Sequence, residues 1–302
     1  MDFLASVEMF GDEVLGFSSS VDVVTVTGPD ARSFLQGQIT QDLAGVQIGE
    51  RTLSFVLTPN GRVVSLASVH RRAPESFWLV VEVGEGESLL ARLQKFKLRV
   101  KVVLELRDGS RLRLIGPSAA DSVGDLDEDV SRGDLGWSAC TGVELISIGP
   151  VALTWPDEGD PQLLEYLRIS SGMPIASHDL DDRTLVHETP LADRTVSYTK
   201  GCFTGQELVA RLDARGANVA RHLRGVRIEL ADTGRIPESG DSLLFEGTEI
   251  GRLRSVAPTL DRMHAVAFAM AHRSIAIGTE ASVIGAVNAV ALSALITELP
   301  MR

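Results

Sequence analysis

Short strand-like segments separated by turn residues run through this chain and restrict it to a sheet-rich fold. In the first part of the chain, β-branched and apolar residues predict strands at 21–27, 51–57, 62–69, 77–83, 100–106 and 112–115. Apolar residues at helical spacing predict helices at 31–36 and 87–96. Pro59-Asn60-Gly61 is typical of a tight hairpin turn. This mixture predicts an α+β fold rather than a strict βαβ array.

The rest of the chain changes character twice. A helix is expected after Pro117, two strands on either side of Gly149-Pro150, and an amphipathic helix at 161–170 that ends before Pro174. From about residue 217 short apolar segments recur with glycine between them, at 223–230, 242–245, 248–256, 263–270 and 281–286. That rhythm predicts a small all-β barrel. We expect three domains, an N-terminal α+β domain at 1–114, a second α+β domain at 115–214 and the barrel at 215–302.

Length and composition fit a cytoplasmic protein of two or three domains. The 302 residues are 44% hydrophobic and 23% charged, which argues against wholesale disorder. No uninterrupted apolar run reaches the length of a membrane span, and the acidic N-terminal residues lack the basic, apolar pattern of a signal peptide. The two cysteines, Cys140 and Cys202, are too few for a disulfide framework or a self-contained thiolate metal site.

The net charge of −12 disfavours extensive direct binding of nucleic acid. The charge is uneven, however, because residues 121–134 carry six carboxylates and residues 200–227 carry six fixed cations. The acidic run is typical of a solvated loop. The basic stretch surrounds the most unusual local sequence in the chain, so an anionic ligand is a reasonable hypothesis there.

That unusual sequence is Lys200-Gly201-Cys202-Phe203-Thr204-Gly205-Gln206-Glu207. Two glycines flank the Cys-Phe-Thr stretch and predict a tight turn, and the helix expected at 206–212 has Thr204 as its candidate cap. Cys202 would then lie before a helix N-terminus and two residues from Lys200, and both features favour a thiolate. The alternative is that Cys202 is a small buried apolar residue.

Polar groups beside this turn are suited to binding a heterocycle that carries a carboxylate tail. Gln206 and Glu207 offer an amide and a carboxylate for bidentate hydrogen bonds to a fused-ring heterocycle. Arg211, Arg215 and Arg221 are candidates for holding a carboxylate tail. Helix-dipole pairing for Glu207 and solvated surface positions for the arginines are the structural alternatives.

The segment KGCFTGQELVARLDARGAN (200–218) resembles the signature of the YgfZ family of folate-binding proteins. Two further segments resemble elements of that family in the same order, VVTVTGPDARSFLQGQITQD (23–42) and RISSGMP (168–174). The resemblance therefore spans most of the chain. These proteins are similar in fold to the glycine-cleavage T-protein, a tetrahydrofolate-dependent aminomethyltransferase.

The resemblance implies a three-domain cloverleaf around a central channel that holds tetrahydrofolate or a derivative. It also implies an accessory role in the assembly or repair of iron–sulfur enzymes and, through them, in tRNA modification. Cys202 would be the working thiol, with Lys200 beside it, and it is also a possible ligand of a transient cluster shared with a partner. Gln206, Glu207, Arg168 and Arg215 are the candidate folate-binding residues. The expected partners are folate and iron–sulfur assembly proteins or target enzymes, with no membrane, and the chain is expected to be a monomer.

Three positions depart from the T-protein pattern. Ser65 and Leu66 stand where that enzyme has an acidic pair after the first glycine hairpin, and Ser170 stands where it has a glutamate that holds the pterin. Without those carboxylates, aminomethyl transfer lacks electrostatic and proton-handling groups. The sequence therefore favours an accessory protein and leaves open whether the chain is an enzyme.

Two other hypotheses remain from the sequence. An aminomethyltransferase-like one-carbon transferase would need an acid or base, for which Asp193, Glu188 and His187 are the remaining candidates. Direct recognition of tRNA would use the cations of residues 200–227, although the net charge and the few aromatic residues count against it. The spacing of His178, His187 and His264 does not indicate a metal site.

Overall fold

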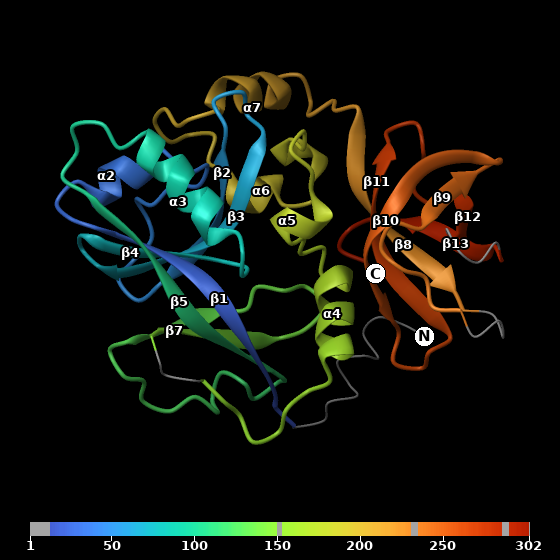
Figure 1. Ribbon diagram of the computed structural model, residues 1–302, viewed down its shortest axis with the longest axis horizontal. Helices are drawn as coiled ribbons and strands as arrows, with labels where there is room; N and C mark the ends of the chain where they lie inside the picture. Colours follow the sequence, from blue (N-terminus) through green and yellow to red (C-terminus); the bar gives the residue numbers. More distant parts are fainter. Residues whose placement is uncertain (1–12, 150–152, 231–234, 286–289, 302) are drawn as a thin grey trace.

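The described residues are organised around two antiparallel β-structures, a sheet and a barrel. The computed structural model describes residues 13–149, 153–230, 235–285 and 290–301. A seven-stranded sheet has the order β2-β3-β4-β1-β5-β7-β6, and a closed six-stranded barrel has the order β10-β11-β8-β13-β12-β9. The expected α+β fold with a C-terminal barrel is confirmed (Figure 1).

The elements have the following bounds. The sheet contains β1 (Leu15–Thr27), β2 (Arg51–Leu57), β3 (Val63–Ala73), β4 (Ser76–Val81), β5 (Val103–Ile115), β6 (Val130–Asp134) and β7 (Gly142–Ile148). The barrel contains β8 (Arg221–Glu229), β9 (Ser242–Phe245), β10 (Thr248–Pro258), β11 (His264–His272), β12 (Glu280–Ile284) and β13 (Leu292–Thr297). The helices are α2 (Ala31–Gln36), α3 (Gly86–Lys95), α4 (Pro161–Ser170), α5 (Ala176–Asp179), α6 (Ala192–Thr195), α7 (Gln206–Asp213) and the 3-10 helix η1 (Val186–Glu188).

Several local predictions differ from the structure. The two strands expected at 100–106 and 112–115 are one strand, β5, because β1 pairs with it from Val103 to Ile115. The strand can continue through position 109 because glycine has no side chain. A Cβ at Gly109 would lie only 2.8 Å from the carbonyl oxygen of Ser147 on the neighbouring strand and would push the two strands apart. The helix expected after Pro117 is a series of turns.

The strand expected after Gly149-Pro150 is also different. Residues 153 and 154 are not in a strand, and residues 150–152 lie outside the described residues, as does the end of the segment expected at 281–286. The predicted boundary between residues 114 and 115 falls at the end of β5, and β6 and β7 beyond it still join the same sheet.

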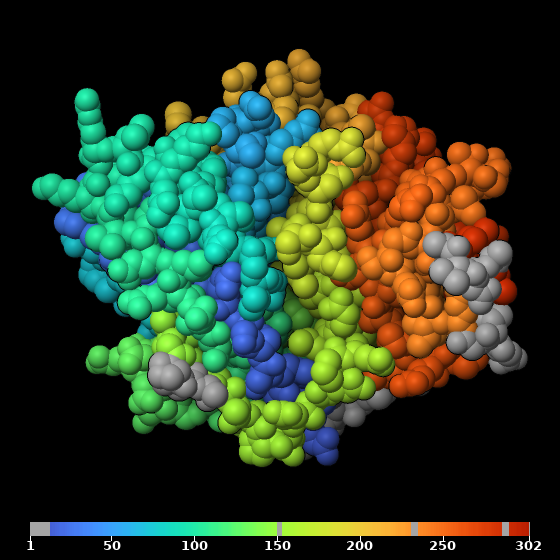
Figure 2. All heavy atoms as spheres, in the orientation of Figure 1, coloured from blue at the N-terminus to red at the C-terminus, as the bar shows by residue number. Residues whose placement is uncertain are grey.

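Helix α4 lies between the sheet and the barrel. Its predicted bounds, 161–170, are those observed, because Pro161 occupies the first turn and the Asp160 carboxylate accepts a hydrogen bond from the backbone N–H of Gln162 at 2.9 Å. The helix packs against β10 and β11, and α5 contacts both β3 and β10. In the space-filling view these yellow-green segments separate the sheet from the orange and red barrel (Figure 2).

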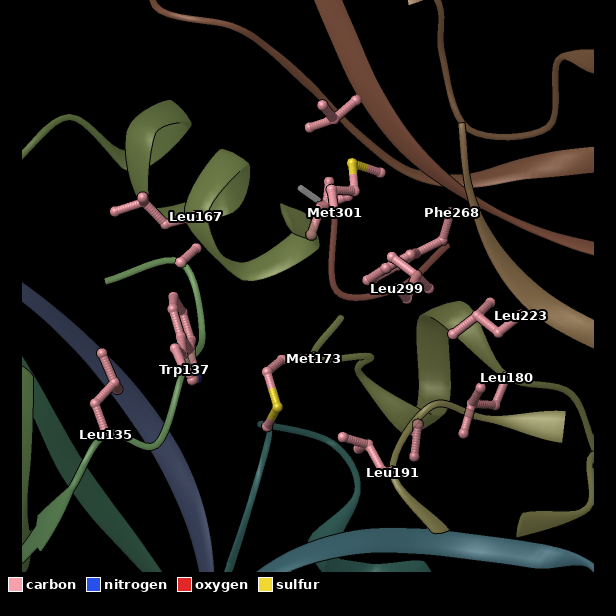
Figure 3. Packing of buried hydrophobic residues seen from close by; sticks show 14 of the residues in the cluster. Leu135, Trp137, Leu167, Met173, Leu180, Leu191, Leu223, Phe268, Leu299 and Met301 are labelled. Carbon is pink, nitrogen blue, oxygen red and sulfur yellow. The ribbon is translucent and has the colours of Figure 1, made fainter. Parts of the chain in front are cut away.

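One hydrophobic core extends from the sheet through α4 into the barrel. Trp137 and Leu135 come from the sheet side, Leu167 from α4, and Phe268 and Leu299 from the C-terminal part, and all five are buried in one cluster (Figure 3). Burial of this much apolar surface fixes how the sheet and the barrel sit relative to each other. No helix among the residues described is long and apolar enough to cross a membrane.

The edges of the sheet approach each other. Strands β2 and β6 are at opposite ends of the strand order, yet the Arg51 side chain donates to the carbonyl oxygen of Asp134. Fully buried His70 on β3 bonds Ser131 on β6 through Nδ1 at 2.8 Å and Ser68 through Nε2 at 2.9 Å. The sheet therefore curls around an interior, and polar side chains close it.

Replacement of His70 by Asn tests this closure. Burial lowers the pKa of His70 to about 3, so the folded state keeps it neutral while the unfolded chain binds a proton below its ordinary pKa of 6.5. This residue therefore makes the free energy of unfolding fall as the pH drops below about 6.5. We expect His70→Asn to cost about 1–3 kcal/mol at pH 7, because the buried serine hydroxyls lose their partner.

The same variant has a distinctive pH dependence. Between pH 7 and pH 5 the wild type should lose about 2 kcal/mol that His70→Asn does not lose, so the two stabilities converge. Urea unfolding at both pH values measures this difference. Parallel pH profiles for the two proteins would show that His70 is not neutral and buried as described.

Candidate functional site

The motif loop before α7 is fastened to the segment that follows α2. Buried Lys200 donates from Nζ to the carbonyl oxygens of Ile39 at 3.0 Å and Gln41 at 2.8 Å. Its ammonium group also lies 5.3 Å from the centre of the Phe203 ring. Burial lowers the pKa of Lys200 to about 8. Lys200 therefore joins the two family-like segments, and its three-donor head is directed to backbone carbonyls.

A second anchor lies at the other end of the loop. The backbone N–H of Thr204 donates to the carbonyl oxygen of Gly37 at 3.0 Å, and its hydroxyl donates to the same oxygen. Thr204 was expected to cap α7, but the capping position is Gly205, and no side chain caps the helix there. The Thr204 side chain is directed to the α2 segment instead.

Gly205 allows the loop to touch the β2–β3 hairpin. Its φ of +86° lies in the left-handed region that favours glycine. A Cβ at this position would lie 2.8 Å from the carbonyl oxygen of Thr58 and 3.1 Å from Cα of Gly61. The motif therefore needs glycine here for both its backbone conformation and its close packing.

Cys202 lies between these two anchors and is exposed. The alternative that it is a buried apolar residue is therefore excluded. Cys140 has that role instead, because it is buried in the main core and burial raises its pKa to about 12. The loop holds one thiol at the surface on a backbone that is fastened on both sides.

The other residues predicted around the motif are dispersed. Gln206 is half-buried and accepts a hydrogen bond from the backbone N–H of Phe203 at 3.4 Å, whereas Glu207 is exposed. Arg215 is exposed beyond the end of α7. Arg221 is occupied by Asp181, at 2.6 Å, and by Glu188. The structure therefore does not gather Arg215 and Arg221 into one carboxylate-binding site.

Arg168 lies apart from the motif loop and is deeply buried. It forms ion pairs with Asp179 at 2.9 Å and Glu165 at 2.6 Å and donates to the Met173 carbonyl oxygen at 2.6 Å. Burial alone would lower the pKa of Arg168, but its bonds to Glu165 and the charge of Asp179 raise it. Arg168 also lines a polar recess in the interior of the curled sheet.

That recess contains charged residues that sequence reasoning missed. Arg111 and Arg113 on β5 both approach Glu144 on β7 at 3.2 Å, and Arg111 also pairs with Glu82 at 2.6 Å. Burial alone would raise the pKa of Glu144, but the two arginines lower it. Trp137 forms part of the wall, its ring centre 5.2 Å from the Arg113 guanidinium.

A signal for the recess was present in the sequence. Charged residues alternate with leucine in Arg111-Leu112-Arg113-Leu114, and Glu144 lies among the apolar residues Val143, Leu145 and Ile146. Charges at inward strand positions are costly unless they are paired, so such a pattern indicates a buried polar network. What the sequence lacked was the pairing of β5 with β7, which brings the charges together.

The recess adjoins a larger cleft between the two edges of the sheet. The recess itself holds about 70 Å³, and the cleft holds about 750 Å³. Arg51 and Leu53 line both spaces. A cleft of this volume lies in the range of small-molecule and cofactor sites. The residues that line the two spaces do not include Cys202.

The positions that depart from the T-protein pattern are placed as follows. Ser65 and Ser170 are buried, and among the described residues neither hydroxyl has a hydrogen-bond partner. Leu66 lines the recess. These side chains supply no carboxylate at those three points.

The acid or base candidates of the transferase hypothesis lie elsewhere. His187 is buried and bonds the Tyr198 hydroxyl through Nε2 at 3.0 Å, and burial lowers its pKa. Glu188 is buried and pairs with Arg221, and Asp193 is exposed. None of the three lines the recess or the cleft. In the described part of the chain no three His, Cys, Asp or Glu side chains are grouped so as to hold a metal ion.

Comparison with known proteins defines the class first. The family described as GCVT N-terminal domain matches residues 17–154. The glycine cleavage system aminomethyltransferase T from Bartonella henselae has a similar structure, with a TM-score of 0.78, 19% identity and coverage of 99% of this chain and 89% of that one. The protein therefore has the fold of the T-protein aminomethyltransferases.

Sequence relatives include YgfZ proteins and an aminomethyltransferase. The tRNA-modifying protein YgfZ of Klebsiella pneumoniae is 29% identical over 73% of this chain and 72% of its own. An aminomethyltransferase from Symbiobacterium thermophilum is 27% identical over 91% of this chain and 82% of its own. The resemblance stated from the sequence motifs is confirmed, since the chain is similar in sequence to YgfZ proteins over about 70% of its length.

Two glycines of the motif provide a matched test of the loop. We expect Gly205→Ala to destabilise the protein by at least about 2 kcal/mol, because it adds a Cβ at positive φ and against the Thr58 carbonyl oxygen. Gly201→Ala should remain within about 0.5 kcal/mol of the wild type, since no atom lies within 4 Å of its Cβ position. Thermal unfolding checks both, and equal effects would contradict the described packing.

Proposed function

We propose that this protein binds tetrahydrofolate or a derivative and supports the assembly or repair of iron–sulfur enzymes, and through them tRNA modification. Cys202 is its working thiol. The observation that carries the proposal is the exposed Cys202 on a loop fastened at Lys200 and Thr204. A fastened, exposed thiol is available to a partner protein, whereas a buried one is not. The name of the Klebsiella relative, a tRNA-modifying protein, supports the same role.

The recess and the adjoining cleft have features that fit a folate. The ring of Trp137 offers an aromatic wall, and Glu144, Arg111 and Glu85 offer donors and acceptors that suit the polar edge of a pterin. Arg51 brings a buried Nε atom that has no partner among the described residues. Gln206 and Glu207, the binding residues expected from the motif, line neither space. When bound, a tetrahydrofolate would supply a carrier for a one-carbon unit.

Within this proposal Cys202 could have either of two roles. As a cluster ligand, Cys202 needs thiolates from a partner, because one cysteine cannot hold an iron–sulfur cluster alone. As a nucleophile, its thiolate would form a bond to the one-carbon unit while the bond from that carbon to a folate nitrogen breaks and the nitrogen takes up a proton. Since Cys202 lies outside the recess and the cleft, the partner-facing role agrees better with its position.

Direct recognition of tRNA has weaker support. The six cations of residues 200–227 do not act as one patch, because Lys200 is buried on backbone carbonyls and Arg221 is paired with two carboxylates. The proposal therefore connects the protein to tRNA modification through its partners, which are iron–sulfur assembly proteins or their target enzymes. We expect the protein to act as a monomer in the cytoplasm and away from membranes.

The alternative is an aminomethyltransferase-like one-carbon transferase. Its support is the Symbiobacterium relative, which aligns with 91% of this chain. Against it, Ser65, Leu66 and Ser170 replace the acidic groups of the T-protein pattern. Conversion of tetrahydrofolate to its methylene form with an aminomethyl-lipoyl donor would favour this alternative.

Titration calorimetry and complementation test the proposal together. We expect micromolar binding of tetrahydrofolate by the wild type and by Cys202→Ala, because the thiol lies outside the recess and the cleft. In a deletion strain that carries Cys202→Ala or Cys202→Ser, the activity of the iron–sulfur enzymes should be at least about tenfold lower than with the wild type. The reason is that sulfur is a stronger metal ligand and nucleophile than the methyl group or hydroxyl that replaces it. The measurement is the activity of those enzymes in cell extract.

The second cysteine is the matched control. Cys140→Ala removes a buried thiol of the core, so it should retain both folate binding and complementation. Full complementation by Cys202→Ser would remove the thiol from the function. Absence of tetrahydrofolate binding by the wild type would remove the folate.

A further inference from the structure

Two arginine side chains meet where the recess joins the cleft. Arg51 comes from the start of β2, and Arg194 comes from α6. A Cβ atom added at Gly136 would lie 3.1 Å from a terminal nitrogen of Arg194 and 3.8 Å from a terminal nitrogen of Arg51. Both residues line the cleft. Segments that are far apart in the sequence thus bring two guanidinium groups together.

Arg51 lines both spaces, whereas Arg194 lines the cleft and contacts Met173 of the recess wall. Arg51 donates to the Ser68 hydroxyl at 3.1 Å on the recess side and to the Asp134 carbonyl oxygen on the cleft side. Arg194 donates to the Met173 sulfur at 3.8 Å and to the Gly136 carbonyl oxygen at 2.6 Å. The two side chains therefore stand at the junction, and a ligand that extends from the recess into the cleft passes them.

The carboxylates near this junction do not balance the positive charge of its arginines. Within the described residues, neither Arg51 nor Arg194 forms an ion pair with a carboxylate, and Arg132 adds a third cation to the cleft. The acidic residues that line the cleft are Asp134 and Glu50. The Asp134 carboxylate accepts from the Gly136 N–H, and that of Glu50 accepts from the Gln47 N–H.

The ionisation of Arg194 reflects the same imbalance. Partial burial of the Arg194 guanidinium and the nearby Arg51 charge lower the pKa of Arg194, and Asp134 only partly offsets them. Like charges held together are stabilised by an anion between them. A chain with a net charge of −12 therefore keeps a local site at which positive charge exceeds negative.

We propose that Arg51 and Arg194 bind the carboxylates of the glutamate tail when a folate occupies the recess and the cleft. This inference rests on the proposed function and adds the subsite for the tail. A guanidinium group matches a carboxylate through two parallel hydrogen bonds, and two such groups suit a chain that carries several carboxylates. The tail subsite is thus at the edges of the sheet, whereas Arg215, its candidate from the sequence, is exposed beyond α7.

Three ligands that differ only in the tail test this assignment. Tetrahydropteroate has no glutamate, tetrahydrofolate has one, and tetrahydropteroyl-triglutamate has three. Titration calorimetry of the wild type should give an affinity for the triglutamate at least about tenfold above that for tetrahydropteroate. Raising the salt from 50 to 200 mM should reduce this preference, because the contacts are ionic.

The variants are Arg194→Gln, Arg51→Gln and the charge-retaining Arg51→Lys. Arg194→Gln should reduce the triglutamate preference about tenfold and leave the affinity for tetrahydropteroate unchanged, because only the tail loses its partner. Arg51→Gln should also reduce the triglutamate preference, and it should weaken the binding of tetrahydropteroate as well because Arg51 lines the recess. Arg51→Lys should keep part of the preference. Thermal unfolding without ligand shows whether each variant is folded, and Arg194 is the safer site because it is more exposed than Arg51.

A matched control removes the same charge elsewhere. Arg107 on β5 is exposed and pairs with Glu105 at 3.2 Å, so Arg107→Gln should keep the wild-type preference. An unchanged preference in folded Arg194→Gln and Arg51→Gln would overturn the tail subsite while the proposed function stands. If the wild type binds none of the three ligands, the proposed function and the subsite both fail.

Discussion

The buried guanidinium of Arg168 connects the parts of this protein. From α4 it reaches Asp179 at the end of α5 and the Ser255 hydroxyl on β10, so one side chain connects two helices and the barrel. Asp179 in turn accepts hydrogen bonds from the backbone N–H groups of Ile175 and Ser255. Removing one partner of such a pair leaves a buried charge without compensation, which costs several kcal/mol. The surrounding hydrophobic core depends on this network remaining complete.

The same arrangement separates two chemical regions. The curled sheet encloses paired charges, and the cleft between its edges opens beside Arg51 and Arg194. The motif loop lies on a different part of the chain, with Cys202 exposed between the anchors at Lys200 and Thr204. The cavities and the exposed thiol thus lie at different places, which agrees with the proposal that the protein binds a folate while Cys202 meets a partner.

The accuracy of the sequence predictions follows from how local each signal is. The bounds of α4 were predicted because Pro161 and the cap Asp160 act within one turn. The division of β5 into two strands was wrong, because Gly109 breaks the local pattern while pairing with β1 on one side and β7 on the other continues through it. Thr204 was wrongly expected as a cap, since its hydroxyl bonds the Gly37 carbonyl oxygen, far away in sequence.

The sequence by itself determined the α+β class, the barrel rhythm and the motif that carries Cys202, because side-chain periodicity and turn residues act over a few positions. Only the tertiary structure decided which candidates share a site. It separated Arg215 from the cavities and brought Arg51 on β2 to Arg194 on α6. Strand order and the curl of the sheet set these distances, and both depend on contacts between residues that lie far apart along the chain.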